Sequence, residues 1–293
     1  MSDTTQTTPT TTPSPDNWES LDEPIAWRPS EEYLKRSRLL SFMRRHGIGE
    51  YDALLKRAAD DPSWFWDAVS DDLGLVWQRP YTQVMDTSRG PEWTRWYVGG
   101  QFNYVATALD QHANSERSSV TALIWEGEDG EVRRFTYAEL QALTNQTANA
   151  LRELGVGKGD RVGIYMPMIP EVVAATLACG KIGAIYTPIF SGYGAEAIAT
   201  RLRDSGAKLL VTADGFYRRS KVVPMKATAD AALAEAPDVE RALVVRRIGG
   251  DVPWVATRDV AWDEIVGKQS PACETLVTDA EDPYMLIYTS GTT

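Results

Sequence analysis

The stretch VGIYMPMIPEVVAATLACGKIGAIYTPI, residues 162–189, decides the fold. It starts with an apolar strand at Val162–Met166, continues through a helix from Pro170 to about Ile182, and returns to an apolar strand at Ala184–Ile189. Two strands joined by a helix of this length form a βαβ unit, in which the strands run parallel. The stretch therefore predicts an α/β domain.

The alternation of strands and helices extends on both sides of this unit. Upstream, Glu128-Asp129-Gly130 between two apolar runs predicts a hairpin, and Thr136 with Glu139 forms a capping box for a helix that ends near Gly155. Downstream we expect a helix at Ala195–Ser205, a strand at Lys208–Thr212, a helix near Met225–Ala236 and a strand at Ala242–Val245. The fold class is α/β, with mostly parallel sheets flanked by helices.

The region before this domain has a different composition. Residues 1–16 contain seven Thr and three Pro but no Lys or Arg, so we expect a disordered leader and neither a signal nor a transit peptide. Residues 17–110 hold seven of the ten tryptophans and show helix signals: Ser30 precedes a run that ends at Gly47, and Pro62 opens another helix. We interpret this region as a small helical cap and its tryptophans as packing anchors.

Composition excludes several classes of function. A net charge of −11 argues against a nucleic-acid or membrane surface as the main partner. Cys179 and Cys273 are far apart, which fits a reducing cytoplasm, and they have no metal-ligand spacing. His46 and His112 are equally isolated, so neither a metal site nor a histidine-based triad is expected.

Two glycine-containing segments are candidate ligand loops. The segment Ile189–Gly194 follows a predicted strand and leads into a helix, where a ligand can meet backbone N–H groups. An ordinary turn is an equally good interpretation of that segment. Gly155–Asp160 lies between a helix and a strand, the reverse of a dinucleotide fingerprint, so we interpret it as a helix end and turn.

A basic cluster follows the strand at Lys208–Thr212. If this segment is helical, Arg218 and Lys221 share a face, with Arg219 between them. Cations at the carboxyl end of a strand suit a phosphate group, although a solvated basic surface is the usual alternative. In so acidic a chain we favour phosphate binding.

The chain ends with Thr289, Ser290, Gly291, Thr292 and Thr293, directly after an apolar run at Tyr284–Ile287. We expect a buried strand that delivers a hydroxyl-rich loop to the ligand edge of the sheet. Glycine allows close approach of a ligand, and the hydroxyls can donate to phosphate oxygens. The loop lacks the Gly-Lys-Ser/Thr ending of a Walker A motif, and we interpret it as a phosphate-binding loop that stops halfway.

Several of these segments together resemble the AMP-forming adenylating enzymes, and among them acetyl-CoA synthetase and its short-chain acyl relatives. The likeness runs from about Asn17 to the end. The segments that carry it are Gly99–Asn103, Thr136–Leu140, Gly159–Val162, Ile164–Glu171, Leu177–Cys179, Ile182–Ala184, Ile189–Ala197, Asp279–Pro283 and Ile287–Thr293.

The resemblance implies a two-step ligation with ATP, coenzyme A and Mg²⁺. A carboxylate such as acetate forms an acyl-adenylate with release of pyrophosphate, and CoA then displaces AMP. By motif position, residues Thr289 to Thr293 hold the ATP phosphates, Arg218, Arg219 and Lys221 lie on the CoA-phosphate segment, and Phe190, Ser191 and Gly192 lie near the pantetheine arm.

In that family the acyl, magnesium and catalytic residues lie beyond the phosphate loop. We therefore expect no catalytic residue here, a first part of the adenylation domain at residues 111–293 that is truncated within the loop, and no activity of the chain alone without its missing C-terminal half. Propionate is an open alternative to acetate. A non-catalytic CoA- or nucleotide-binding module, or a part that folds only against a missing half, also remains open.

Overall fold

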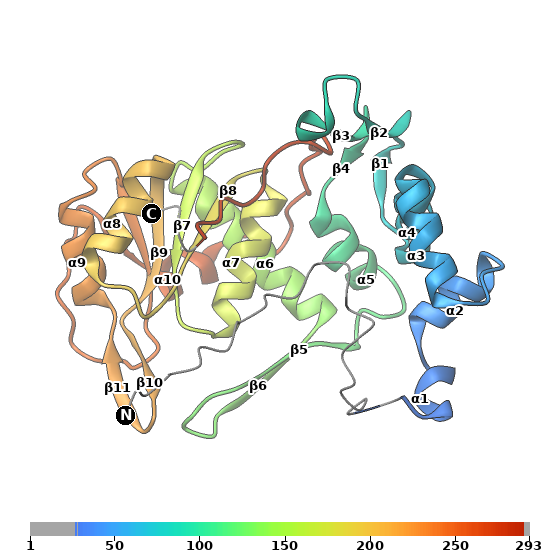
Figure 1. Ribbon diagram of the computed structural model, residues 1–293. Coiled ribbons are helices and arrows are strands. Elements are labelled where there is room, and N and C mark those ends of the chain that lie inside the picture. The colour runs from blue at the N-terminus through green and yellow to red at the C-terminus, as the bar shows by residue number, and fades with distance from the viewer. Residues whose placement is uncertain (1–26, 28, 290–293) are drawn as a thin grey trace, which may run out of the picture. The chain divides into compact units, whose positions relative to one another are not determined.

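The computed structural model describes residue 27 and residues 29–289 (Figure 1). The expected leader at residues 1–16 lies outside these residues. The chain forms two compact units that divide between Asp60 and Asp61. The described part of the first unit contains helices α1 (Glu31–Lys35), α2 (Arg38–Arg45) and α3 (Tyr51–Asp60).

The single helical run expected from Ser30 to Gly47 is in fact two helices. Ser30 caps α1 as predicted, but Ser37 has extended backbone and its hydroxyl accepts the N–H of Leu40 at 3.4 Å. Ser37 therefore starts a second helix, because a capped N-terminus interrupts the first one. Gly47, with φ +66°, lies just after α2, as the sequence predicted.

The second unit opens with α4 and short strands that the sequence did not predict. Pro62 is the first residue of α4 (Pro62–Leu73), as expected. Two antiparallel pairs follow, β1 (Trp77–Arg79) with β4 (Gln101–Phe102) and β2 (Gln83–Asp86) with β3 (Arg95–Val98), together with the 3₁₀ helix η2 (Pro91–Trp93), the π-helix η3 (Ala106–Asp110) and α5 (Gln111–Ala113). These strands have only two to four residues, so their alternation of apolar and polar residues is too short to be told apart from a helical pattern.

Trp77 confirms the interpretation of a tryptophan as a packing anchor. Its ring centroid lies 4.8 Å from Tyr81, 5.0 Å from Tyr97 and 5.1 Å from Phe102. Its Nε1–H donates to Ser70 Oγ at 3.0 Å, so the polar edge of the half-buried ring is satisfied. Trp93 is 62% exposed and does not serve in this way.

The core of the second unit is a five-stranded parallel sheet, which confirms the predicted fold class (Figure 1). The strands lie in the order β13-β12-β9-β7-β8, and every neighbouring pair is parallel. Their bounds are β7 (Arg161–Tyr165), β8 (Ile185–Ile189), β9 (Ala207–Ala213), β12 (Arg241–Val245) and β13 (Asp259–Ala261). Only β13, a three-residue strand, was not predicted.

Helices cover both faces of this sheet. They are α6 (Tyr137–Glu153), α7 (Pro170–Lys181), α8 (Ala195–Ser205), α9 (Lys226–Ala234) and α10 (Trp262–Ile265), followed by the 3₁₀ turn η4 (Val266–Lys268). The capping box of Thr136 and Glu139 is formed at the start of α6. Because β8 and β9 lie on opposite sides of β7, right-handed crossovers put α7 and α8 on opposite faces.

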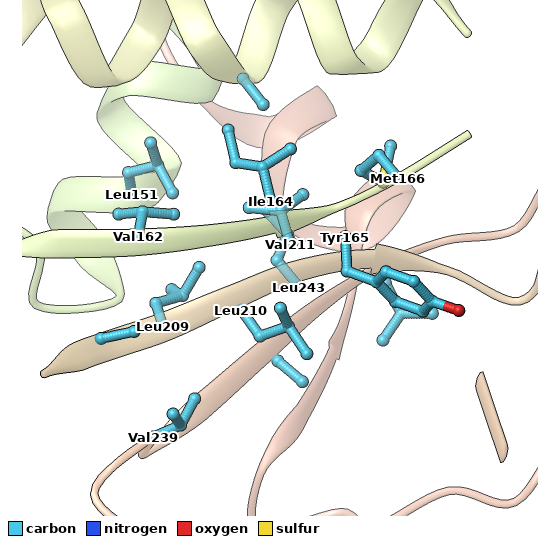
Figure 2. Packing of buried hydrophobic residues seen from close by; sticks show 14 of the residues in the cluster. Leu151, Val162, Ile164, Tyr165, Met166, Leu209, Leu210, Val211, Val239 and Leu243 are labelled. Atoms are coloured by element: carbon cyan, nitrogen blue, oxygen red, sulfur yellow. The ribbon is translucent and has the colours of Figure 1, made fainter. Parts of the chain in front are cut away.

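Side-chain packing agrees with this arrangement. Val162 of β7 lies beside Leu151 of α6 on one face (Figure 2). On the other face Gly163 is packed so closely that an added Cβ would lie 2.5 Å from Leu202 of α8. Ile164, Leu209, Leu210, Val211 and Leu243 fill the same cluster and are at most 3% exposed. Strands this apolar on both faces are typical of a parallel sheet.

Two hairpins project from the sheet region. The first, β5 (Thr121–Glu126) with β6 (Val132–Thr136), was predicted. The second is β10 (Gly215–Arg218) with β11 (Lys221–Pro224), so the segment is not the helix that we took as the condition for placing Arg218 and Lys221 on one face. Arg219 and Ser220 have φ +50° and +59°, as in a two-residue type I′ turn, so Arg218 pairs across the hairpin with Lys221.

The predicted buried strand at Tyr284–Ile287 is also wrong. The segment makes one isolated parallel bridge, between Met285 and Tyr186 of β8. The N–H of Tyr186 donates to the carbonyl of Tyr284 at 3.1 Å, and the N–H of Leu286 donates to the carbonyl of Tyr186 at 3.0 Å. Ile287 is 60% exposed, because two hydrogen bonds to a single neighbour do not enclose the side chains.

Candidate ligand-binding site

A cavity of about 410 Å³ lies at the carboxyl edge of the sheet. It collects residues from the loops that follow β7, β8, β9 and β12, and from the hairpin β5–β6. The connection from β7 runs to β8 at one edge of the sheet, whereas the connection from β9 runs to β12 toward the opposite edge. Ligands of open α/β sheets bind at the point where the strand order reverses in this way. The lining residues are Trp125, Glu126, Gly127, Glu128, Pro167, Met168, Ile169, Phe190, Ser191, Phe216, Tyr217, Arg218 and Arg247.

Three of the six residues predicted for CoA line this cavity: Phe190, Ser191 and Arg218. The other three do not. Gly192 lies next to the ring of Phe190, where an added Cβ would be 2.6 Å from Cε1. Arg219 occupies the turn of the second hairpin, and Lys221 lies directly opposite Arg218, so Arg218 and Lys221 share a face as cross-strand partners and not as neighbours on a helix.

A hydrogen bond from Tyr165, the last residue of β7, holds the turn after β8. The hydroxyl of Tyr165 donates to the carbonyl of Ser191 at 3.2 Å, and burial raises the pKa of that phenol. The ring of Phe190 is 59% exposed and contacts Tyr193 edge-on, with centroids 5.5 Å apart. The backbone of this turn is thus fixed, while an aromatic face stays open to a ligand.

Arg247 is a site residue that the sequence reasoning missed. Its guanidinium lies between the rings of Trp125 and Tyr217, 5.0 and 5.3 Å from their centroids. It also pairs with Asp129 at 2.6 Å and with Glu131 at 3.2 Å, and the hydrogen bond from Arg247 lowers the pKa of Asp129. A signal existed: Arg247 follows the predicted strand Ala242–Val245, as Arg218 follows the preceding one.

A buried aspartate ties the two arginine loops together. Asp214 has no exposed surface, and its carboxylate accepts four backbone N–H groups at 2.7–3.1 Å. The donors are Gly215, Arg247, Ile248 and Gly249. One carboxylate therefore sets the positions of both the hairpin β10–β11 and the loop after β12.

Trp125 fixes the hairpin β5–β6 over the cavity. Its Nε1–H donates to the carbonyl of Met168 at 2.7 Å, in the loop after β7. The cavity thus has aromatic walls and two guanidinium groups, with Glu126 and Glu128 at one side. Rings that stack and cations that pair with phosphate suit an organic anion with a flat group.

A second cavity of about 400 Å³ shares Met168, Phe190 and Ser191 with the first. Ile287 and Tyr288 contribute to its wall. The Tyr288 hydroxyl donates to Asp204 at 2.5 Å, and burial together with this hydrogen bond raises the pKa of Tyr288 to about 12. Of the residues predicted to hold ATP phosphates, the structure describes only Thr289; Ser290, Gly291, Thr292 and Thr293 lie outside the described residues.

The glycine segment between α6 and β7 forms a turn. Gly155 and Gly159 have φ +88° and +80° in the connection between α6 and β7, which confirms a turn instead of a dinucleotide loop. Within residues 27 and 29–289, no three His, Cys, Asp or Glu side chains form a group that could hold a metal ion. Among the helices described, none has the length and hydropathy needed to cross a bilayer.

A parallel sheet that is flanked by helices and has a cavity at its carboxyl edge defines an open α/β fold with a candidate ligand site. Comparison with known families refines this class. Residues 109–293 match the family of AMP-binding enzymes, and residues 51–108 match the acetyl-coenzyme A synthetase N-terminus. The chain belongs to the AMP-binding enzyme family, as the resemblance predicted.

Individual relatives agree with this assignment. The chain is 44% identical to acetyl-coenzyme A synthetase of Rhodopirellula baltica and 44% identical to 3-hydroxypropionyl-coenzyme A synthetase of Sulfurisphaera tokodaii, over 83% of this chain and 37% of each relative. It is similar to the structure of acetoacetyl-CoA synthetase from Streptomyces lividans, with a TM-score of 0.82 and 28% identity over 91% of this chain and 41% of that one. The chain thus spans about two fifths of the length of these relatives.

Proposed function

We propose that this chain is part of an AMP-forming acid–thiol ligase that joins a short-chain carboxylate, acetate in the first place, to coenzyme A. The observation that carries the proposal is the cavity at the sheet edge, which brings Phe190, Ser191 and Arg218 together with Arg247. The relatives include both acetyl- and 3-hydroxypropionyl-coenzyme A synthetases, which supports short-chain acids as the substrate class.

The proposed reaction has two balanced steps. A carboxylate oxygen attacks the α-phosphorus of ATP, and the bond from that phosphorus to the bridging oxygen breaks to release pyrophosphate. The sulfur of CoA then attacks the acyl carbon, the thiol proton leaves, and AMP departs with the bond electrons. We assign no described residue to Mg²⁺, because the described residues hold no fitting ligand group.

Within this reaction the described residues bind and orient CoA. Arg218 supplies positive charge for its phosphates, and the aromatic rings of Trp125 and Tyr217, with Arg247 held between them and paired to Asp129 and Glu131, supply flat surfaces. The turn Phe190–Gly192 adjoins the second cavity, through which a flexible thiol arm would pass toward Tyr288 and Thr289. We further propose that Thr289 to Thr293 hold the ATP phosphates.

We also propose a division of the chain near residue 110. Residues 17–110 would form the N-terminal region of an acetyl-CoA synthetase, and residues 111–293 would contribute the first part of the adenylation domain. Because we assign no catalytic side chain within the chain, we propose that residues 1–293 alone do not release pyrophosphate from ATP and acetate. Acetate-dependent pyrophosphate release above background would contradict this.

Titration calorimetry of the chain with coenzyme A tests the binding role. We expect Arg218→Ala to weaken CoA binding about 10-fold, because a charged hydrogen bond is worth about 1.5–3 kcal/mol. Pantetheine, which lacks the phosphates, should bind both proteins equally. Arg203→Ala is the matched control, since Arg203 is on α8, pairs with Glu235 and does not line the cavity. Equal CoA binding by Arg218→Ala and the wild type would overturn the proposal.

A further inference from the structure

An arginine on α8 lies between the two proposed ligand segments. Arg201 is 6% exposed, and its guanidinium carbon is 4.5 Å from the ring centroid of Tyr193 and 5.3 Å from that of Tyr288. Tyr193 belongs to the turn after β8, and Tyr288 directly precedes Thr289. One buried cation therefore contacts the residue that follows the segment proposed for CoA and the residue that precedes the segment proposed for the ATP phosphates.

The position of Arg201 is itself fixed. Its Nη1–H donates to the carbonyl of Ala197, one turn earlier on α8, at 2.9 Å. A guanidinium retains its charge at all relevant pH values and is attracted to the face of an aromatic ring, more strongly when it is shielded from water. Arg201 can therefore contact both rings at once while its hydrogen bond to Ala197 keeps the guanidinium in place.

On either side, the contacts continue to the ligand segments. Tyr193 contacts the ring of Phe190, and its N–H donates to the carbonyl of Phe190 at 3.0 Å, which closes the turn. Tyr288 is held a second time by α8, because its hydroxyl donates to Asp204. The contacts form a continuous chain from Phe190 through Tyr193, Arg201 and Tyr288 to Thr289.

We propose that Arg201 is a positioning residue that couples the conformation of the turn 190–193 to that of segment 287–289. The identity of the two ligands rests on the proposed function, but the coupling itself does not. Disturbing one tyrosine should loosen the segment of the other, although their rings meet only through the guanidinium. Contact between neighbouring residues does not by itself show that the two segments are coupled, so the coupling has to be measured between the two ends of the network.

Hydrogen exchange of the free chain measures this coupling directly. We expect Tyr288→Leu to speed amide exchange in residues 190–194 about five-fold, which is the lower range of coupling between sites. In an Arg201→Met background, where the turn is already loosened, Tyr288→Leu should add nothing. Tyr193→Leu should likewise speed exchange at Tyr288 and Thr289 only when Arg201 is present. This double-mutant cycle isolates the contribution of the guanidinium.

Controls separate positioning from a general loss of stability. Arg203→Met removes an arginine two residues away on α8, where 45% of the side chain is exposed, and should leave exchange in the turn unchanged. Arg201→Lys, which keeps the charge but loses the planar group, should restore part of the coupling. If Tyr288→Leu leaves residues 190–194 unchanged, or changes them equally in both backgrounds, the proposal is overturned.

CoA affinity supplies the functional readout. We expect Tyr288→Leu to raise the dissociation constant of CoA about five-fold in the wild type and not in Arg201→Met. If the wild-type chain does not bind CoA, the proposed function fails, and the exchange experiment still decides whether Arg201 couples the two segments. If CoA binds normally and exchange is uncoupled, only the role of Arg201 fails.

Discussion

The cavity at the carboxyl edge of the sheet and the segment 284–289 differ in how each is held. Loops from four strands converge on the cavity, and Asp214 and Trp125 join those loops through hydrogen bonds. Segment 284–289 is joined to the sheet by one bridge to β8 and by contacts of Tyr288 with α8. The segment that leads into the hydroxyl-rich loop thus occupies the less enclosed position, as the 60% exposure of Ile287 shows.

The largest effect should come from Asp214→Ala. Removing this carboxylate leaves four buried or half-buried N–H groups without their acceptor, and we expect the free energy of unfolding to fall by about 4 kcal/mol. Urea denaturation followed by tryptophan fluorescence measures it. Asp251→Ala, at an exposed position of the neighbouring loop, should cost less than about 0.5 kcal/mol. Similar losses in the two variants would remove the distinction between the regions.

A pair of core and surface truncations sharpens the same comparison. Leu210→Ala should lower the free energy of unfolding by about 3 kcal/mol, since Leu210 is fully buried in β9. Ile287→Ala, at a residue that is 60% exposed, should cost less than about 0.5 kcal/mol. A loss of 2 kcal/mol or more at Ile287 would show that segment 284–289 is enclosed in solution.

Trp125→Phe should have a smaller effect that is confined to the cavity. Phenylalanine keeps a ring against Arg247 but cannot donate to the carbonyl of Met168, and we expect a loss of about 1 kcal/mol in thermal or urea unfolding. CoA affinity should fall about three-fold, because a hydrogen bond that holds the hairpin over the cavity is lost. Trp93→Phe, at a ring that is 62% exposed, serves as the control and should change neither quantity.

The smallest effect concerns the ionisation of Tyr288. Its pKa in the folded chain is raised to about 12 by burial and by the hydrogen bond to Asp204, whereas an unfolded tyrosine ionises near 10. The stability from this group is therefore complete below pH 10 and is lost as pH rises from about 10 to 12. The difference between the ultraviolet titration curves of the wild type and of Tyr288→Phe should show one phenol with a pKa near 12. Asp204→Asn should shift it toward 10; an unshifted phenol would contradict the hydrogen bond.

The sequence predicted the central fold well because its signals are local and repeated. The strand β7, the helix α7 and the strand β8 each lie within two residues of their predicted bounds. The capping box of Thr136 and Glu139 and the first-turn proline Pro170 fix helix starts by contacts a few residues apart. Such contacts do not depend on the rest of the fold.

The errors occur where distant partners or backbone dihedrals decide the outcome. Arg219 and Ser220 gave no glycine signal for a hairpin turn, although both have positive φ. The apolar run Tyr284–Ile287 has strand composition, but composition does not say how many neighbours it pairs with. Arg247 belongs to the site through Asp214 and Trp125, which are 33 and 122 residues away in the sequence. The place of Arg247 after the predicted strand Ala242–Val245 is a local signal, but the contacts that hold it in the site are not visible in any local pattern.

The rigidity of the basic hairpin could be increased by changing its turn residues, Arg219 and Ser220. Side chains other than glycine and asparagine are strained in a type I′ turn, so replacing the two residues with Asn-Gly should rigidify the hairpin without touching Arg218. The natural sequence therefore keeps a strained turn beside its ligand cavity where a more relaxed pair was available. The strained turn also places the positive charge of Arg219 at the tip of the hairpin.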